Sequence, residues 1–274
     1  MYAHHVIDWI DRWGKTDPLK KDKLNKLKNY ILNSVQFNLG EFDRVVQFDK
    51  KINLNEFVAE YNPFLKIPFD TCWFDWTAGG YRLGLIIRKI DSAVFSHEFI
   101  PFGIDPVDKT KWNVTPIVFI EKGWDRYKIY NYFSEEEFKE FKDGDALTHH
   151  FVVFFKTILF LNAKNIVYKK IDPPAKLNKK REKKSKTKLF DYHILTINDT
   201  LVRTKSTISV NATNKRLHFC RGHFKKYAKE KPLFGKITGL YWWDAHIRGK
   251  NKNGFVAKDY KVNYDKHLPG AINA

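Results

Sequence analysis

Histidines in the C-terminal part of the chain are the residues whose types best suit acid–base chemistry. An imidazole can accept or donate a proton near neutral pH, and a neighbouring arginine can stabilise charge that develops on a phosphate. A metal-independent ribonuclease needs little more, with His223, His246 and Tyr227 as its catalytic groups. Histidines near predicted strands are more often structural, so this enzyme is an alternative hypothesis. The polar residues that could gather there are His218, Arg221, His223, Tyr227, His246 and Arg248.

The sequence contains no complete motif for a metal or a cofactor. His218, Cys220 and His223 lie close together, but zinc ligands usually come as Cys-x-x-Cys or as two histidines one helical turn apart. Asp70 and Asp75 lack the companion acid-x-lysine of a metal-dependent nuclease. Phosphate-cradling glycine loops and the serine elbow of hydrolases are also missing from the sequence. We therefore expect no metal and no cofactor, and ATP-driven and nicotinamide chemistry are disfavoured.

The most biased segment of the chain, residues 176–188, holds eight basic residues against one acid, Glu182. Lysine-dense segments neutralise phosphates and release condensed counterions, which gives salt-sensitive binding with little sequence preference. A solvated linker that contacts nothing is the other interpretation of such a charge run. We expect an exposed loop here, with phosphate contacts from Lys179, Lys180, Arg181, Lys183 and Lys184.

A second basic region, residues 203–252, holds 13 basic residues against two acids and interleaves them with aromatic rings. Cations for the backbone and flat rings for exposed bases are typical of proteins that bind RNA or single strands. At least half of the rings are expected to be buried, since the region is small. We expect Trp243 or Tyr241 to stack on a base. The predicted phosphate contacts of this region are Arg221, Lys225, Lys226, Lys236 and Arg248.

The net charge of +18 belongs almost entirely to the second half of the chain. Residues 146–274 carry 28 basic and 8 acidic residues, whereas residues 40–145 carry 14 basic and 19 acidic ones. Solubility does not require charges of one sign in one half, so we expect a polyanion as the partner. RNA or DNA is the leading candidate. The alternatives are an acidic protein, as for a virion component or a host-interaction protein, and the surface of a membrane.

The N-terminal residues and the cysteines indicate the expected compartment. Residues 1–13 lack the basic and apolar regions of a signal peptide. The longest apolar stretch, Phe151–Ala163, is too short to span a membrane and contains Lys156. We therefore expect a soluble cytoplasmic protein, in the host cytoplasm if a phage encodes it, with Cys72 and Cys220 as free thiols.

Hydrophobic periodicity places helices first and strands next in the N-terminal half. Apolar residues at three- and four-residue spacing predict an amphipathic helix over Lys20–Gln36 and a shorter one over His4–Trp13. Gly79-Gly80 lies between two strand-like runs and predicts a hairpin turn. The predicted strands are Arg44–Phe48, Pro68–Trp76, Tyr81–Ile90, Val114–Ile120 and Tyr127–Phe133.

The second half begins with helices and ends in a β-rich region. A capping box of Ser134 and Glu137 predicts a helix start, and a second helix follows from about Asp145 to Asn162. Asn165–Ile171 and Leu189–Ile197 are predicted strands. The expected fold class is α+β, with a mostly antiparallel sheet, packed helices and a smaller basic β-rich C-terminal unit. The expected organisation is an N-terminal unit of residues 1–171, a basic loop of 172–188 and a C-terminal unit of 189–274, unless one sheet continues through both.

Three stretches of the last 100 residues resemble an uncharacterised family of phage and prophage proteins. They are IDPPAKLNKKREKKSKTKL from Ile171, LHFCRGHF from Leu217 and PLFGKITGLYWWDAHIRG from Pro232. The resemblance implies a phage or mobile-element origin and implies no activity. Glycines in such motifs suit tight turns or close backbone approach. The positions that match the motifs are Arg221, His223, Gly235, Gly239, Trp242 and Arg248.

Overall fold

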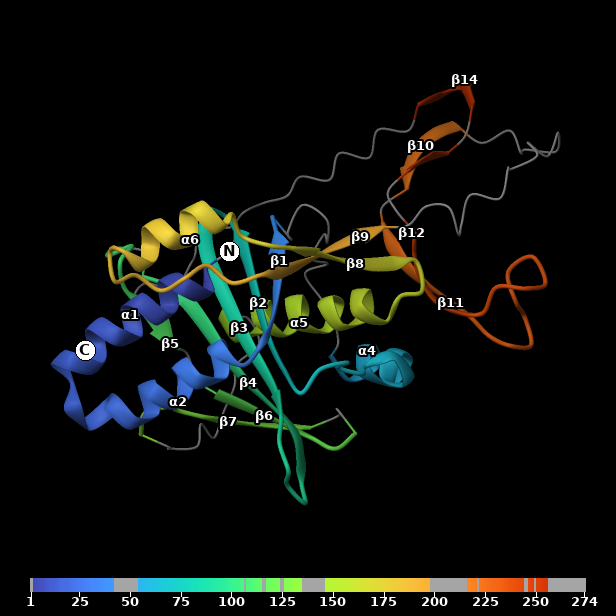
Figure 1. Ribbon diagram of the computed structural model, residues 1–274. Coiled ribbons are helices and arrows are strands. Elements are labelled where there is room, and N and C mark those ends of the chain that lie inside the picture. The colour runs from blue at the N-terminus through green and yellow to red at the C-terminus, as the bar shows by residue number, and fades with distance from the viewer. Residues whose placement is uncertain are drawn as a thin grey trace. The chain divides into compact units, whose positions relative to one another are not determined.

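The protein has an α+β fold, in which helices cover a large mixed sheet (Figure 1). The computed structural model describes residues 2–41, 54–105, 107–114, 117–123, 126–134, 146–197, 216–220, 222–243, 246–248 and 250–255. The α-helices within these residues are α1 (Ala3–Thr16), α2 (Lys21–Leu32), α4 (Leu54–Tyr61), α5 (Ala146–Asn162) and α6 (Ala175–Glu182). Short 3₁₀ turns, η1 (Pro18–Lys20) and η2 (Asn62–Phe64), precede α2 and follow α4.

The described part of the large sheet has nine strands, and most neighbours are antiparallel. The order is β7-β6-β4-β3-β2-β1-β9-β8, with β5 paired to β4. The exception is β1, which runs parallel to both β2 and β9. The strands are β1 (Val35–Gly40), β2 (Thr71–Ala78), β3 (Tyr81–Lys89), β4 (Phe95–Ile104), β5 (Trp112–Val114), β6 (Ile117–Glu121), β7 (Tyr127–Tyr130), β8 (Ile166–Ile171) and β9 (Tyr192–Ile197).

Both faces of the central strands are buried under helices. Cys72 and Phe74 of β2 belong to the apolar cluster that includes Leu159 of α5, whereas Trp73 belongs to the cluster that includes Ile7 of α1. The side chains of a strand alternate between the two faces of its sheet, so successive residues enter different cores. This double burial explains why these strands appear in the sequence as unbroken apolar runs instead of alternating ones.

The hairpin between β2 and β3 confirms the turn predicted at Gly79-Gly80. The φ angles of the two glycines are 55° and 82°, which suits a type I′ turn and is unfavourable for other residues. The next strand, β4, is not among the strands predicted from the sequence. Pro101 lies between the residues of β4 that pair with β6 and those that pair with β5, where the ladder on that side is interrupted.

The predicted helix Lys20–Gln36 is correct in its first part and wrong at its end. Helix α2 stops at Leu32, and Asn33 and Ser34 donate side-chain hydrogen bonds to carbonyls of the last turn. Val35 continues the apolar spacing of the helix but begins β1. The predicted strand at 44–48 and most of the predicted capping box, including Glu137, lie outside the described residues.

Helix α5 confirms the second predicted helix, and β8 and β9 confirm the two strands expected after it. The 17 residues of α5 are apolar over most of their length, and the described ones pack into the core between the sheet and α4. In the described part of the chain, no helix combines the length and the apolar character that crossing a membrane requires.

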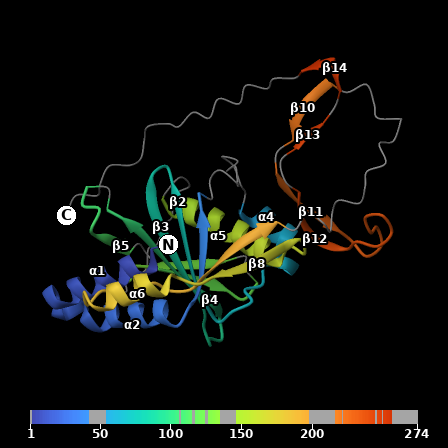
Figure 2. The same cartoon turned by 45° about the horizontal axis from the view of Figure 1, so that its top comes forward.

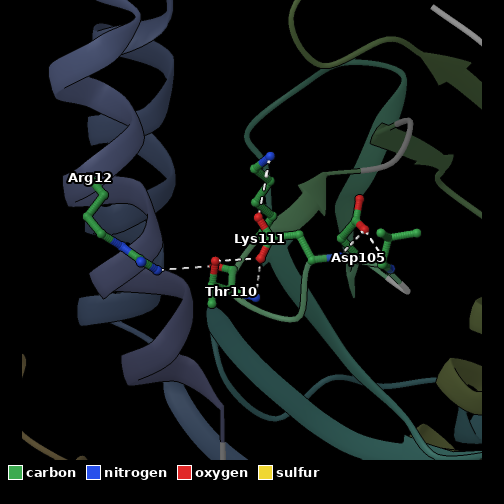
Figure 3. Close-up of polar contacts among 6 residues, drawn as sticks. Arg12, Asp105, Thr110 and Lys111 are labelled. Carbon is green, nitrogen blue, oxygen red and sulfur yellow. Dashed lines mark hydrogen bonds and ion pairs between the residues drawn. The ribbon is translucent and has the colours of Figure 1, made fainter.

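Helix α1 is fixed to the sheet at both ends. Asp75, fully buried on β2, accepts hydrogen bonds from the Tyr2 amide at 2.8 Å and from the Trp73 indole at 3.0 Å. Burial raises the pKa of this carboxyl, and the N–H donors of the helix start oppose that rise. Farther along α1, Arg12 donates to the Thr110 carbonyl at 3.1 Å, in a turn held together by Asp105 and its neighbours (Figure 3).

The chain divides into two compact units. The first contains Met1–Arg203 and Phe224–Trp243, and the second contains Thr204–His223 and Asp244–Ala274. A strand pair, β11 (His223–Tyr227) with β12 (Gly239–Trp243), lies almost wholly in the first unit. The described strands of the second unit form a three-stranded sheet of β13 (His246–Arg248), β10 (Arg216–Cys220) and β14 (Lys250–Phe255).

Candidate nucleic-acid interface

The basic segment after β8 is a helix and a turn, whereas the sequence predicted a loop. We call residues 175–188 the α6 segment; it begins with α6 and lies inside the first unit. Leu177 donates its amide to the Pro174 carbonyl at 2.9 Å, so the proline pair starts the first turn. After α6, Ser185 adopts a positive φ of 50° and reverses the chain. The helix was missed because it has no buried side chain and therefore no apolar periodicity.

Arg181, predicted to contact phosphate, instead attaches the α6 segment to α1. Its guanidinium donates to Asp8 at 3.2 Å and to the Thr187 carbonyl at 2.6 Å. The Thr187 amide also donates to Asp8, at 3.1 Å, so one carboxylate holds both sides of the turn. Burial opposes ionisation of Asp8, but the hydrogen bonds from Thr187 and the charge of Arg181 outweigh it and lower its pKa. The side chain of Arg181 is 17% exposed, which leaves it little access to a ligand.

The other predicted cations of the α6 segment face solvent. Lys179 lies one helical turn before Lys183, whose amide donates to the Lys179 carbonyl at 3.2 Å at the C-terminal cap of α6. Lys180 lies within α6, whereas Lys184 lies in the turn that follows it. The only acid of the segment, Glu182, pairs with Lys188 at 2.8 Å. The exposed lysines of the segment are Lys176, Lys179, Lys180, Lys183, Lys184, Lys186 and Lys188.

Strand β8 adds cations along the edge of the large sheet. It is the last strand in the sheet order, and residues 167–170 are all exposed. Lys169 faces solvent, whereas Lys170 pairs with Asp191 at 2.8 Å and with Asp172 at 3.6 Å. The hydrogen bond and charge of Asp191 raise the pKa of Lys170. Lysines at a sheet edge also discourage pairing with another strand, which is their ordinary structural role.

The β11–β12 arm, residues 223–243, is attached where α5 meets β8. The Asn165 side chain donates to the Trp242 carbonyl at 2.7 Å and accepts from the Trp242 amide at 2.9 Å. The buried Trp242 ring packs against Phe160 and Phe224, with ring centroids 4.7 and 4.9 Å away. Gly239 has a φ of 107°, and a Cβ there would lie 2.8 Å from Cε of Lys164. Gly239 therefore allows the backbone of β12 to pass close to the Lys164 side chain.

Two aromatic residues expected to stack on bases are occupied by contacts within the protein. Tyr241 is buried, and its ring meets Tyr227 edge-on at 6.0 Å. Trp243 is half-buried, and Nζ of Lys225 lies 4.4 Å from the centroid of its ring. Lys226 donates to the Glu60 carbonyl at 3.2 Å, which ties β11 to α4. The exposed cations of the arm are Lys226, Lys229, Lys231 and Lys236.

The α6 segment and the β11–β12 arm lie at opposite ends of β8, as Figures 1 and 2 both show. The strand starts beside the arm, at Asn165, and ends at Ile171, just before α6. A strand of this length spans about 20 Å. The α6 segment and the arm are therefore separate clusters, with Lys169 and Lys170 of β8 between them.

The predicted catalytic residues belong to two different units. The register of β10 and β13 pairs Cys220 with His246 and His218 with Arg248. His223, which is exposed, follows Cys220 by three residues and belongs to the same unit as His246. Tyr227 belongs to the other unit, and burial raises its pKa. Arg221 lies outside the described residues.

The described residues offer no alternative site of metal chemistry. No group of three His, Cys, Asp or Glu side chains among them could hold a metal ion. Asp75 serves α1, and Asp70 pairs with Lys89 at 3.0 Å on the surface. The buried Cys72 has a pKa raised to about 12 by its burial, so its thiol is not activated as a nucleophile.

One exposed ring, Phe234 at the end of the arm, was not singled out from the sequence. It was one of several aromatics between lysines, and composition does not separate exposed rings from buried ones. The local signal is the order Pro-Leu-Phe-Gly-Lys, because a proline and a glycine around a ring indicate a turn.

Comparisons of this chain with models of protein families, with curated proteins and with solved structures found no match.

Proposed function

We propose that this protein binds RNA or DNA, with the lysines of the α6 segment neutralising backbone phosphates. The observation that carries the proposal is the closeness of exposed lysines, with Lys179 and Lys183 one helical turn apart, on a segment held in place by Arg181 and Asp8. Like charges one helical turn apart repel each other by a few tenths of a kcal/mol. A polyanion removes this repulsion, whereas an uncharged partner does not.

Fixing the lysines on a helix and on the turn that follows it favours phosphate binding over a role as a flexible linker. The hydrogen bonds of Asp8 to Arg181 and Thr187 hold the backbone of the segment before any ligand arrives. The side chains must still be ordered on binding, but the backbone is already ordered, so its entropy does not oppose binding. Such contacts recognise phosphates and not base sequence, so little sequence preference is expected.

The proposal predicts a steep dependence of affinity on salt. If the four lysines at 179, 180, 183 and 184 each neutralise one phosphate of a duplex, the slope of log K against log salt is about −3.6. The affinity then falls by roughly 100-fold between 50 and 200 mM salt. Fluorescence anisotropy with a labelled duplex, measured at several salt concentrations, gives this slope directly.

A charge-matched pair of variants tests where the phosphates bind. The triple variant Lys179→Gln, Lys180→Gln, Lys183→Gln should lower the magnitude of the slope by about 2.7, which is about 0.9 for each phosphate that is no longer neutralised. The control variant Lys66→Gln, Lys109→Gln, Lys122→Gln removes the same charge from exposed positions elsewhere. Equal decreases in both variants would show that net charge, and not the α6 segment, drives binding.

A metal-independent ribonuclease is a second candidate, supported by the pairing of Cys220, three residues before His223 in the chain, with His246. Acid–base cleavage by two imidazoles needs no metal. RNA cleavage should then continue in EDTA and disappear in both His223→Ala and His246→Ala. Activity retained by either variant, or abolished by EDTA, would exclude this mechanism.

The phage or mobile-element origin stays a prediction from the resemblance of the C-terminal motifs.

A further inference from the structure

The arm ends in a closed turn that displays one aromatic ring. Leu233 and Ile237 face each other in an isolated bridge, with N–H···O distances of 2.9 and 3.0 Å in the two directions. The Gly235 amide donates to the Pro232 carbonyl, just before this bridge, at 3.3 Å. We call residues 233–237 the arm tip. Phe234, Gly235 and Lys236 form its end.

The backbone of the arm tip holds Phe234 in an unusual conformation. Its φ is 53°, in the left-handed region that residues with side chains rarely adopt, and Gly235 follows with a φ of 72°. A bulky residue in this region is strained, and the closing hydrogen bonds of the tip hold it there. Phe234 is 64% exposed, which makes it the most exposed of the phenylalanine, tyrosine and tryptophan residues whose burial the structure describes.

Lysines surround this ring in the sequence and face solvent. Lys236 is part of the arm tip, Lys231 lies just before it, and Lys229 is two residues farther back. Leu233 and Ile237 are only half-exposed, so the ring is not part of a wide apolar patch of the kind that marks a protein interface. A flat ring with cations beside it matches single-stranded nucleic acid, in which bases stack on the ring and phosphates meet the lysines.

We infer that Phe234 stacks on an unpaired base and thereby makes the protein prefer single-stranded over double-stranded nucleic acid. This inference rests on the proposed function, because it assumes that the partner is a nucleic acid. Trp243 and Tyr241 do not compete for this role: Lys225 covers the first ring, and the second is buried. A base inside a duplex is stacked between its neighbours and offers no free face, so the Phe234 ring contributes nothing to duplex binding.

The test measures binding of the full chain to a 20-nucleotide single strand and to the duplex of the same sequence. Phe234→Ala should weaken single-strand binding about 5- to 100-fold, the usual effect of removing one base–aromatic contact. Duplex affinity and both salt slopes should stay unchanged, since the substitution leaves the charge as it was. Phe234→Tyr should keep the single-strand affinity. The control Leu19→Ala removes another exposed apolar side chain, which lies between α1 and α2.

A 2-aminopurine base in the single strand reports stacking directly. Its fluorescence should be quenched by the wild-type chain and by Phe234→Tyr, and recover in Phe234→Ala. Equal single-strand affinity of the wild type and Phe234→Ala, with salt-sensitive binding intact, would overturn this inference and leave the proposed function standing. A wild-type chain that binds neither probe would overturn both. Thermal unfolding of Phe234→Ala checks that the variant is folded.

Discussion

The α6 segment and the β11–β12 arm are both lysine-rich, but they differ in how they are attached and in what they can bind. Polar contacts hold the α6 segment, through Arg181 and Asp8, and its exposed residues offer charge. An aromatic core around Trp242 holds the arm, and its tip offers a ring as well as charge. Segments of similar composition can therefore suit two kinds of binding: general phosphate binding at one end of β8, and base stacking at the other.

The largest expected effect comes from removing the aromatic anchor of the arm. Trp242→Ala takes out a buried ring and should lower the free energy of unfolding by about 3–5 kcal/mol. Chemical denaturation measures this decrease, and Leu19→Ala, at an exposed position, should show almost none. If the arm loosens while the sheet stays folded, single-strand binding should fall more than duplex binding. An equal fall for the two probes would contradict the division of roles.

Acidic pH should destabilise α1, the helix to which the α6 segment is attached, through protonation of His4. Burial, and then the charges of His5 and Arg181, lower the pKa of His4 to about 3. The unfolded chain binds a proton near pH 6.5, so the stabilisation is complete above that pH and declines as the pH falls towards 3. Between pH 7 and pH 5 this residue alone should cost about 2 kcal/mol.

Denaturant unfolding at a series of pH values measures this effect. His4→Gln should make stability less dependent on pH between 7 and 5, because the variant has no imidazole to protonate. A pH dependence in the variant as steep as in the wild type would show that His4 is not the source. The β11–β12 arm plays no role in this pH effect, so the pH dependence is a further difference between the two regions.

Asp8→Asn distinguishes two roles of Asp8: positioning the α6 segment, or simply reducing its positive charge. The two roles predict opposite changes in duplex affinity. Removing a negative charge beside the α6 segment should strengthen binding of a polyanion if charge alone matters. If Asp8 positions the segment through Arg181 and Thr187, the variant should bind a duplex more weakly. Weakening these charge-assisted hydrogen bonds should also cost about 1–2 kcal/mol of stability. Anisotropy titrations of a duplex decide the sign, and tighter binding by Asp8→Asn would contradict the positioning role.

The smallest expected effect concerns the strand between the two clusters. Asp191→Asn removes the main partner of Lys170, which is an exposed pair, so stability should change by less than about 0.5 kcal/mol. If nucleic acid runs along β8, the released lysine should neutralise one more phosphate and steepen the salt slope by up to about 0.9. An unchanged slope would indicate that the two clusters bind separately.

Burial patterns in the sequence predicted much of the fold but little of what places the cations. The runs that became β2, β3 and α5 were recognisable because their apolar residues enter a core. Helix α6 gave no such signal, since it buries nothing. Arg181 has the same kind of side chain as its neighbours, and its partner Asp8 is 173 residues away in the sequence. Local spacing cannot reveal a contact between residues so far apart along the chain.

The aromatic residues of the arm show the same limit. Phe234, Tyr241 and Trp242 lie within nine residues and have similar hydrophobicity, yet only Phe234 of the three is exposed. Their difference arises from tertiary structure, because Trp242 meets α5 and Phe234 lies at the end of a closed turn. Sequence composition therefore indicated that rings lie among the lysines of this region, but it could not indicate which ring would be exposed.

The proposal that this protein binds polyanions through fixed lysines is tested most directly by the salt dependence of duplex binding by the wild-type chain. The account predicts a linear plot of log K against log salt with a slope of about −3.6. The triple Gln variant at residues 179, 180 and 183 should flatten that slope, and the matched variant at 66, 109 and 122 should not. Affinity that is the same at 50 and 200 mM salt would contradict the account.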